Sequence, residues 1–187
     1  MIELTERRTE NSKTFDLGNG KRALELSIGV IDLAYAAGII DGEGCIQIIK
    51  GRKSKYGVHY HYTLVIRVAM ADPEPILWLK QTFGGGLSYI KSYKTREKGM
   101  YRWSIGARKA KDFLNFISPY LKAKQGQADI ALEFQSLKKP PGTFMRQTSQ
   151  KPIALLEAES ILAEKLQELH GGEQKKDLIL HHKLEGY

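Results

Sequence analysis

Two acidic residues among glycines are the first feature that points to chemistry. Asp41 and Glu43 end the segment Leu33-Ala-Tyr-Ala-Ala-Gly-Ile-Ile-Asp-Gly-Glu-Gly44, which is apolar up to the first acid. The segment predicts a helix with both carboxylates at its C-terminal end, where the helix dipole opposes negative charge. A divalent metal ion would compensate that charge, but Asp-Gly and Glu-Gly pairs are also common in turns. A metal site and a simple turn both stay open on this segment alone.

The same predicted helix carries a stripe of small residues. Ala34, Gly38 and Gly42 are four residues apart, so they lie on one face of a helix, one turn from each other. Small side chains let a second helix approach the backbone closely. The sequence therefore predicts a helix–helix contact on the face that leads to the two acids.

Basic residues are concentrated in two parts of the chain. The 187 residues include 29 Lys and Arg against 21 Asp and Glu, a formal net charge of +8. Residues 44–71 and 86–111 together hold 13 of the basic residues and one acid, and the remainder holds 16 basic and 20 acidic residues. Positive charge confined to part of a folded chain favours nucleic acid as the partner.

Each basic part also predicts a pair of strands. Residues 45–50 and 60–68, and then 87–93 and 100–105, are rich in β-branched and aromatic residues. Alternation puts apolar side chains on one face of this sheet and polar or basic ones on the other, which we call the groove face. Such a face suits the phosphates and base edges of a duplex, although a solvated sheet face is the alternative. Its candidate residues are Gln47, Ile49, Lys53, Lys55, Tyr56, His61, Thr63, Arg67, Tyr89, Lys91, Tyr93, Arg102 and Ser104.

Helices are predicted around the two strand pairs, which gives an α+β fold. Capping residues and apolar periodicity place them at 72–84, 107–118, 125–138 and 152–170, the last closed by Gly171-Gly172. The lone cysteine, Cys45, cannot form an internal disulfide. No secretory signal and no apolar run of about 18 residues is present. We therefore expect a soluble intracellular protein of the cytoplasm, nucleoid or a host organelle, not a secreted one.

The segment Ala36-Ala-Gly-Ile-Ile-Asp-Gly-Glu-Gly44 resembles the signature of the LAGLIDADG homing endonucleases. Phe83-Gly-Gly-Gly86 and Pro119-Tyr-Leu-Lys-Ala-Lys-Gln-Gly-Gln127 resemble two further landmarks of that family, in the same order. The resemblance implies an αββαββα fold over residues 29–170, with a four-stranded antiparallel saddle for DNA and C-terminal helices. Residues 1–28 would be an N-terminal extension, disordered or in contact with DNA, and 171–187 a C-terminal tail.

The resemblance also implies a function and an assembly. Because the motif occurs once, two chains would pair through Ala34, Gly38 and Gly42, and each sheet would read one half of a long pseudo-palindromic target. The homodimer would make a staggered double-strand break by metal-dependent phosphodiester hydrolysis. Two alternatives use the same scaffold: an intron-encoded maturase that binds RNA, and a catalytically inactive DNA-binding regulator.

Roles for individual residues follow from the same resemblance. Glu43 would bind the metal, with the Gly42 carbonyl beside it, and Asp41 would support the helix ends. The metal would be Mg²⁺, with Mn²⁺ as a substitute or Ca²⁺ in a non-cleaving complex. Lys124 would be the second catalytic residue, close to the phosphate that is attacked. Met70 stands where many members have Gln or Asn, and its thioether cannot order water in the same way.

Overall fold

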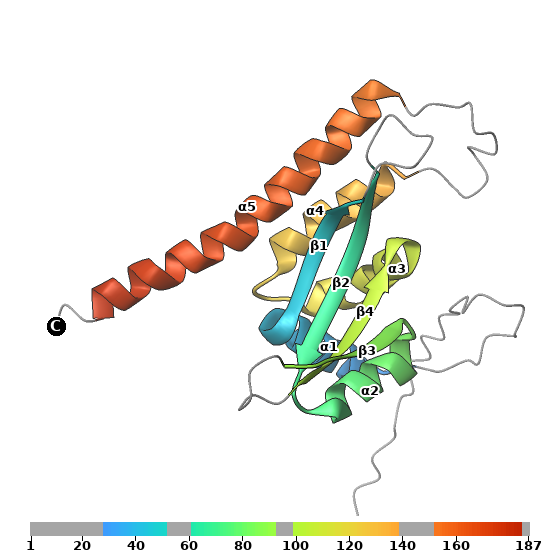
Figure 1. The fold of residues 1–187 in the computed structure, drawn as a ribbon, viewed down its shortest axis with the longest axis vertical. Helices are drawn as coiled ribbons and strands as arrows, with labels where there is room; N and C mark the ends of the chain where they lie inside the picture. Colours follow the sequence, from blue (N-terminus) through green and yellow to red (C-terminus); the bar gives the residue numbers. More distant parts are fainter. Residues whose placement is uncertain (1–27, 52–60, 93–98, 139–151, 185–187) are drawn as a thin grey trace, which may run out of the picture.

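The computed structural model describes residues 28–51, 61–92, 99–138 and 152–184. In the last of these ranges the side chains are described up to His170. The chain order is α1 (Val30–Glu43), β1 (Gly44–Lys50), β2 (Tyr62–Met70), α2 (Pro73–Phe83), β3 (Gly86–Ile90), β4 (Met100–Gly106), α3 (Ala107–Ile117), a 3₁₀ turn (Ser118–Tyr120), α4 (Gln125–Ser136) and α5 (Ile153–Leu184) (Figure 1). The predicted αββαββα order is confirmed, and two helices follow it.

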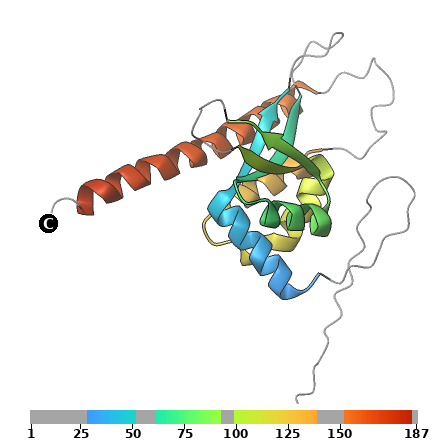
Figure 2. The same cartoon turned by 60° about the horizontal axis from the view of Figure 1, so that its bottom comes forward.

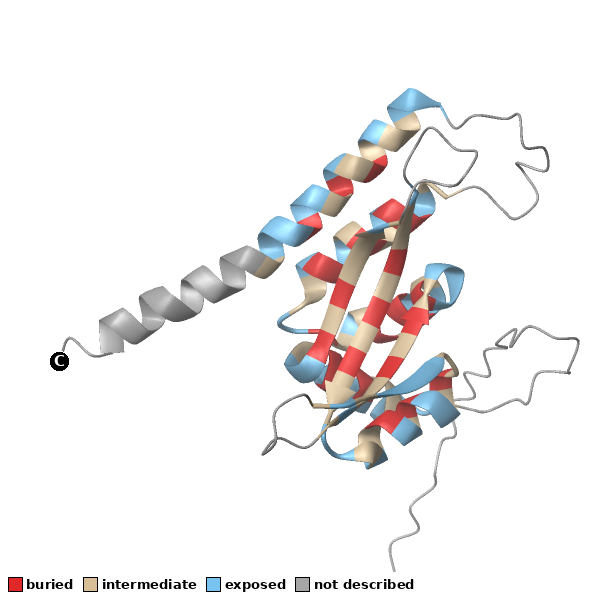
Figure 3. Cartoon of the chain, in the orientation of Figure 1, coloured by how far each residue is buried: buried red, intermediate tan, exposed pale blue. Residues whose placement is uncertain are grey.

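The four strands form one antiparallel sheet in the order β1-β2-β4-β3. Along β2 the residues Leu64, Ile66 and Val68 are fully buried, while Thr63 and the other alternate residues are half-exposed. Figure 3 shows this alternation as bands along β1, β2 and β4. The alternation follows from the strand period of two, so the sheet has one face in the core and one face open.

Helices α1 to α4 cover the core face of the sheet, as Figure 2 shows. Trp103 of β4 is completely buried there, and its ring centroid lies 5.2 Å from that of Phe113 in α3. The indole Nε1 donates a hydrogen bond of 2.7 Å to the carbonyl of Gly84. A Cβ on Gly85 would lie 2.6 Å from the Ser104 carbonyl oxygen, and Gly85 has a φ of 87°. Glycine is therefore required where α2 ends against β4.

The predicted end of the last helix at Gly171-Gly172 is wrong, because α5 continues to Leu184. An internal glycine costs about 1 kcal/mol relative to alanine, which weakens a helix without forcing it to end. The residues from 173 to 184 include Glu, Gln, Lys and Leu and no proline, so they favour continuation of the helix beyond the two glycines. None of the described helices, α5 included, is both long and apolar enough to cross a membrane.

Helix α5 is fastened beside edge strand β1 and helix α4 by a buried ion pair. The Lys138 Nζ lies 2.8 Å from Oε1 of Glu159, whose side chain is completely buried. The same ammonium donates a 2.7 Å hydrogen bond to the Tyr62 carbonyl. The Tyr62 hydroxyl is 3.0 Å from the Ser160 hydroxyl. These contacts connect α5 to the start of β2, at the β1–β2 connection.

We expect Lys138→Met to destabilise the protein by about 3 kcal/mol, because a buried carboxylate would lose its cation. Urea unfolding would measure the change. Lys165→Met, at an exposed position of α5, is the matched control and should change the free energy of unfolding by less than about 0.5 kcal/mol. Equal effects of the two substitutions would contradict an anchoring role for Lys138.

Candidate nucleic-acid interface and acidic helix end

Glu43 is the last residue of α1, and strand β1 begins at the next residue. Glu43 is exposed, and so is Gly42 before it. A Cβ on Gly44 would lie 2.7 Å from the Ile40 Cα, so only glycine lets the strand leave the helix this closely. The direct junction places the acid at the end of the sheet where strand β1 begins.

Asp41 has a different environment from Glu43. Its carboxylate accepts hydrogen bonds from the backbone N–H of Lys122 at 2.7 Å and of Lys124 at 2.9 Å. The Lys124 ammonium donates in turn to the Asp41 carbonyl. Lys124 is the N-cap residue of α4. Asp41 therefore fastens the start of α4 to the end of α1, and it brings Lys124 to the helix end that carries Glu43.

Asp41→Ala should destabilise the protein by about 1–2 kcal/mol, because two backbone N–H groups would lose their acceptor. We also expect the DNA cleavage that the sequence predicts to be slower, since Lys124 would keep the bond from its ammonium to the carbonyl of residue 41 but lose the bond from its backbone N–H to the carboxylate. Thermal unfolding and a cleavage assay measure the two effects. Asp41→Asn keeps one oxygen and should lie between the wild type and Asp41→Ala; an unchanged cleavage rate in Asp41→Ala would contradict the positioning role.

The groove face is open in the structure, and six of the predicted residues lie on it. Strand register places Ser104 opposite Arg67, and Arg102 opposite Ala69 next along the strand. A guanidinium N–H of Arg67 donates a 3.1 Å hydrogen bond to Oε1 of Gln47. The register also places on this face residues that are absent from the predicted set, among them Cys45, Val65, Ala69 and Ser88. The six predicted residues are Gln47, Ile49, Thr63, Arg67, Arg102 and Ser104.

The predicted face of Tyr89 is wrong. Tyr89 pairs with Tyr101, which shares the core side of the sheet with Trp103, and the two tyrosine rings are 5.1 Å apart. Pairing with β4 sets the register of β3, and it puts Ser88 opposite Arg102 instead. Strand β3 also ends at Ile90, short of the predicted end. His61 and Lys91 are exposed just outside the strands, and Lys53, Lys55, Tyr56 and Tyr93 lie outside the described residues.

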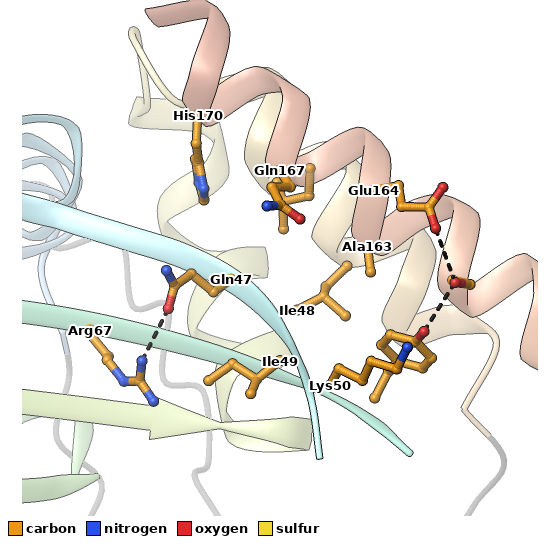
Figure 4. Close-up of a pocket in the computed structure, with 12 residues that line it drawn as sticks. Gln47, Ile48, Ile49, Lys50, Arg67, Ala163, Glu164, Gln167 and His170 are labelled. Atoms are coloured by element: carbon orange, nitrogen blue, oxygen red, sulfur yellow. Dashed lines mark hydrogen bonds between the residues drawn. The ribbon is translucent and has the colours of Figure 1, made fainter. Parts of the chain in front are cut away.

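Gln47 and Arg67 also line a cavity of about 700 Å³ beside the edge of the sheet. Strand β1 supplies one side of the cavity, and Ala163, Gln167 and His170 of α5 lie across from it (Figure 4). The cavity keeps both side chains accessible from solvent, with α5 as a wall next to the groove face.

The stripe of small residues on α1 is open in a single chain. Ala34, Gly38 and Gly42 are exposed, and a Cβ added to either glycine would meet no atom within 4 Å. Ile31 and Tyr35, with exposed fractions of 84% and 49%, extend this uncovered face. Ile31 and Tyr35 precede Gly38 by seven and three residues. This helical spacing could have predicted that they lie on the same face of α1.

The described residues contain no group of three or more His, Cys, Asp and Glu side chains that could hold a metal ion. At the end of α1, one chain offers the Glu43 carboxylate and the Gly42 carbonyl, and both are hard oxygen donors. Such donors suit Mg²⁺ chemically but are too few for its six ligands. Met70, whose thioether cannot order water as an amide side chain does, packs against the hydrophobic core.

A family model described as LAGLIDADG endonuclease matches residues 36–139. Among solved structures, I-CvuI in complex with the I-CreI target is 23% identical, with 74% of this chain and 82% of that chain covered and a TM-score of 0.59. The archaeal intron-encoded homing endonuclease I-Vdi141I, complexed with DNA, is 18% identical over 74% and 84% of the two chains, with a TM-score of 0.57. I-SmaMI, bound to uncleaved target DNA with calcium, is 22% identical over 75% of this chain and 48% of its own, with a TM-score of 0.52. No curated protein matches the chain.

Proposed function

Because the chain belongs to the LAGLIDADG endonuclease family, we propose that it is a homodimeric homing endonuclease that makes a staggered double-strand break with a divalent cation, normally Mg²⁺. One observation carries the proposal: strand β1, which contributes to the open groove face, begins at Gly44 directly after a helix end that carries the exposed acid Glu43. DNA held on the sheet would thus be held against the acid. A regulator or an RNA-binding protein has no evident need for this junction.

The groove face supports duplex DNA as the substrate. Arg67 and Arg102 supply cations, while Gln47, Thr63 and Ser104 supply hydrogen-bonding groups between them. A β-sheet face fits the major groove, where these side chains can contact base edges and phosphates. Neutralised phosphates release counterions, so affinity should fall steeply as salt rises.

The donors at the end of α1 support a divalent cation shared between chains. Glu43 and the Gly42 carbonyl of each chain would hold the ion, with the remaining ligands coming from the partner chain, water and scissile phosphates. When bound, such an ion polarises the phosphate and makes a water ligand a stronger nucleophile at neutral pH.

Lys124 would contribute a fixed positive charge at this site. Its backbone and its ammonium are both tied to Asp41, so the side chain does not have to be ordered when DNA binds. A preorganised cation beside a phosphate stabilises the negative charge that develops during hydrolysis. We propose this role for Lys124 in preference to Lys122, which is exposed and is bound to Asp41 through its backbone N–H and not through its ammonium.

Two features support the homodimer. The uncovered face of α1 has no side chain beyond the backbone at Gly38 and Gly42, which suits a symmetric helix pair. In addition, the chain spans 48% of I-SmaMI, so that protein has room for two copies of the fold in one chain.

The proposal can be tested by selecting DNA duplexes that the protein binds and then measuring whether it cleaves them. Duplexes with a randomised centre would be bound in Ca²⁺, recovered, and then incubated with Mg²⁺ or with EDTA. We expect a pseudo-palindromic consensus that is cut on both strands only with Mg²⁺. A consensus that is bound and never cut would favour the inactive regulator, and stronger binding of structured RNA than of duplex DNA would favour the maturase.

A further inference from the structure

We propose that Gln47 and Arg67 act as one reading unit that selects guanine at one position of each half-site. The inference rests on the proposed function, because it requires duplex DNA on the groove face. Its basis is the 3.1 Å hydrogen bond from Arg67 to Oε1 of Gln47, which joins neighbouring strands β1 and β2 (Figure 4).

The hydrogen bond fixes which way the glutamine amide points. A guanidinium has N–H donors and no acceptor, so Gln47 must present its carbonyl oxygen to Arg67 and keep its NH₂ group for other partners. Arg67 uses one N–H of its fork for this bond and retains the others. One lone pair of the Gln47 carbonyl oxygen is thereby used, so the pair offers mainly donors to a third group.

Guanine is the base that best matches a pair made up mainly of donors. In the major groove guanine presents two acceptors, N7 and O6, and arginine binds them in a bidentate manner. A free glutamine prefers adenine, because its amide accepts from N6 and donates to N7. In this chain Arg67 uses one of the two lone pairs of that acceptor and orients the amide, which favours Gln47 as a donor that supports guanine.

The surroundings of Arg67 leave its side chain room to reach a base. Its cross-strand neighbours on the groove face are Cys45 on β1 and Ser104 on β4, and both are much shorter than arginine. Arg67 is only half-buried, and it lines the open cavity between β1 and α5. The guanidinium is thus the longest group at this point of the sheet, and Gln47 holds it in place.

Selection from a randomised duplex library, read by sequencing, tests the pair and does not require the target sequence to be known. Wild-type protein should select a symmetric guanine in each half-site, with a preference of about tenfold or more over the other bases. Arg67→Ala should lose that guanine and favour adenine there, because the Gln47 acceptor becomes available. Arg67→Lys keeps the positive charge but loses the planar guanidinium that can bind a base through two N–H groups. This variant should retain DNA binding while its guanine preference falls below about threefold.

Gln47→Ala should keep guanine as the first choice with a reduced preference, since Arg67 would be less firmly held. Lys109→Ala removes a positive charge from the exposed surface of α3, away from the groove face, and serves as the charge control; its consensus should match that of the wild type. An unchanged guanine in Arg67→Ala, or uniform weakening on all sequences, would overturn the reading unit. Failure of the wild-type protein to bind any duplex would instead overturn the proposed function.

Discussion

Glu43→Gln is expected to abolish double-strand cleavage while DNA binding stays within about tenfold of the wild type. The substitution preserves size but removes the exposed carboxylate at the end of α1, the one acid there that is not engaged by the start of α4. Without that charge this chain would offer a divalent cation no anionic ligand at the end of α1 and only the neutral Gly42 carbonyl beside the amide, so the cation that would activate water would be held much more weakly. Binding should survive, because the lost charge opposed the phosphates, and tenfold corresponds to about 1.4 kcal/mol.

Two measurements separate this outcome from simple misfolding. Cleavage of the selected target would be followed in Mg²⁺, and affinity would be measured in Ca²⁺ by fluorescence anisotropy. Glu133→Gln, which removes an exposed acid from α4, is the matched control and should cut at the wild-type rate. Mg²⁺-dependent cutting by Glu43→Gln at a rate near that of the control would remove Glu43 from the catalytic centre.

The parts of the interface that can be predicted from the sequence are those with a strong local period. In strand β2 the residues at 64, 66 and 68 are all apolar and the polar residues Thr63 and Arg67 lie between them, so the faces of Thr63 and Arg67 follow from the strand period. In β3 the run Leu87-Ser-Tyr-Ile has no clear alternation, and its register is decided by pairing with β4. For this reason the prediction for Tyr89 is on the wrong face.

Contacts between distant segments are the other feature that local pattern cannot supply. Asp41 and Lys124 are 83 positions apart, and nothing in either segment indicates that one carboxylate accepts from two backbone N–H groups of the other. The Gln47–Arg67 bond, 20 positions apart, depends in the same way on the register of β1 against β2. The sequence indicates the types of residue on the groove face, and only the fold shows which of them act together.

Gly38→Leu is expected to leave the folding of the single chain intact, to weaken dimerisation and to eliminate double-strand cleavage. In a single chain a Cβ at Gly38 meets no atom within 4 Å, so the leucine side chain extends into solvent and clashes with nothing. The free energy of unfolding of the isolated chain should stay the same or rise by up to about 1 kcal/mol, since glycine is a poor residue for a helix interior. In a dimer packed through α1, the same leucine would be inserted twice at the closest approach of the helices. Overpacking of this kind costs well over 1 kcal/mol, so dimerisation should weaken by more than tenfold.

Sedimentation and a cleavage assay on supercoiled plasmid would test the dimer together. The wild-type chain should sediment as a dimer on its target and linearise the plasmid, because each of the two scissile phosphates needs a Glu43. Gly38→Leu should fold, sediment as a monomer and leave the plasmid uncut or nicked in one strand. Gly38→Ala adds one methyl group to the same face and should lie between the two. A wild-type chain that stays monomeric at micromolar concentration, free and on DNA, and still cuts both strands would show that the uncovered face of α1 has another partner, since one chain would then act at both phosphates without a second Glu43.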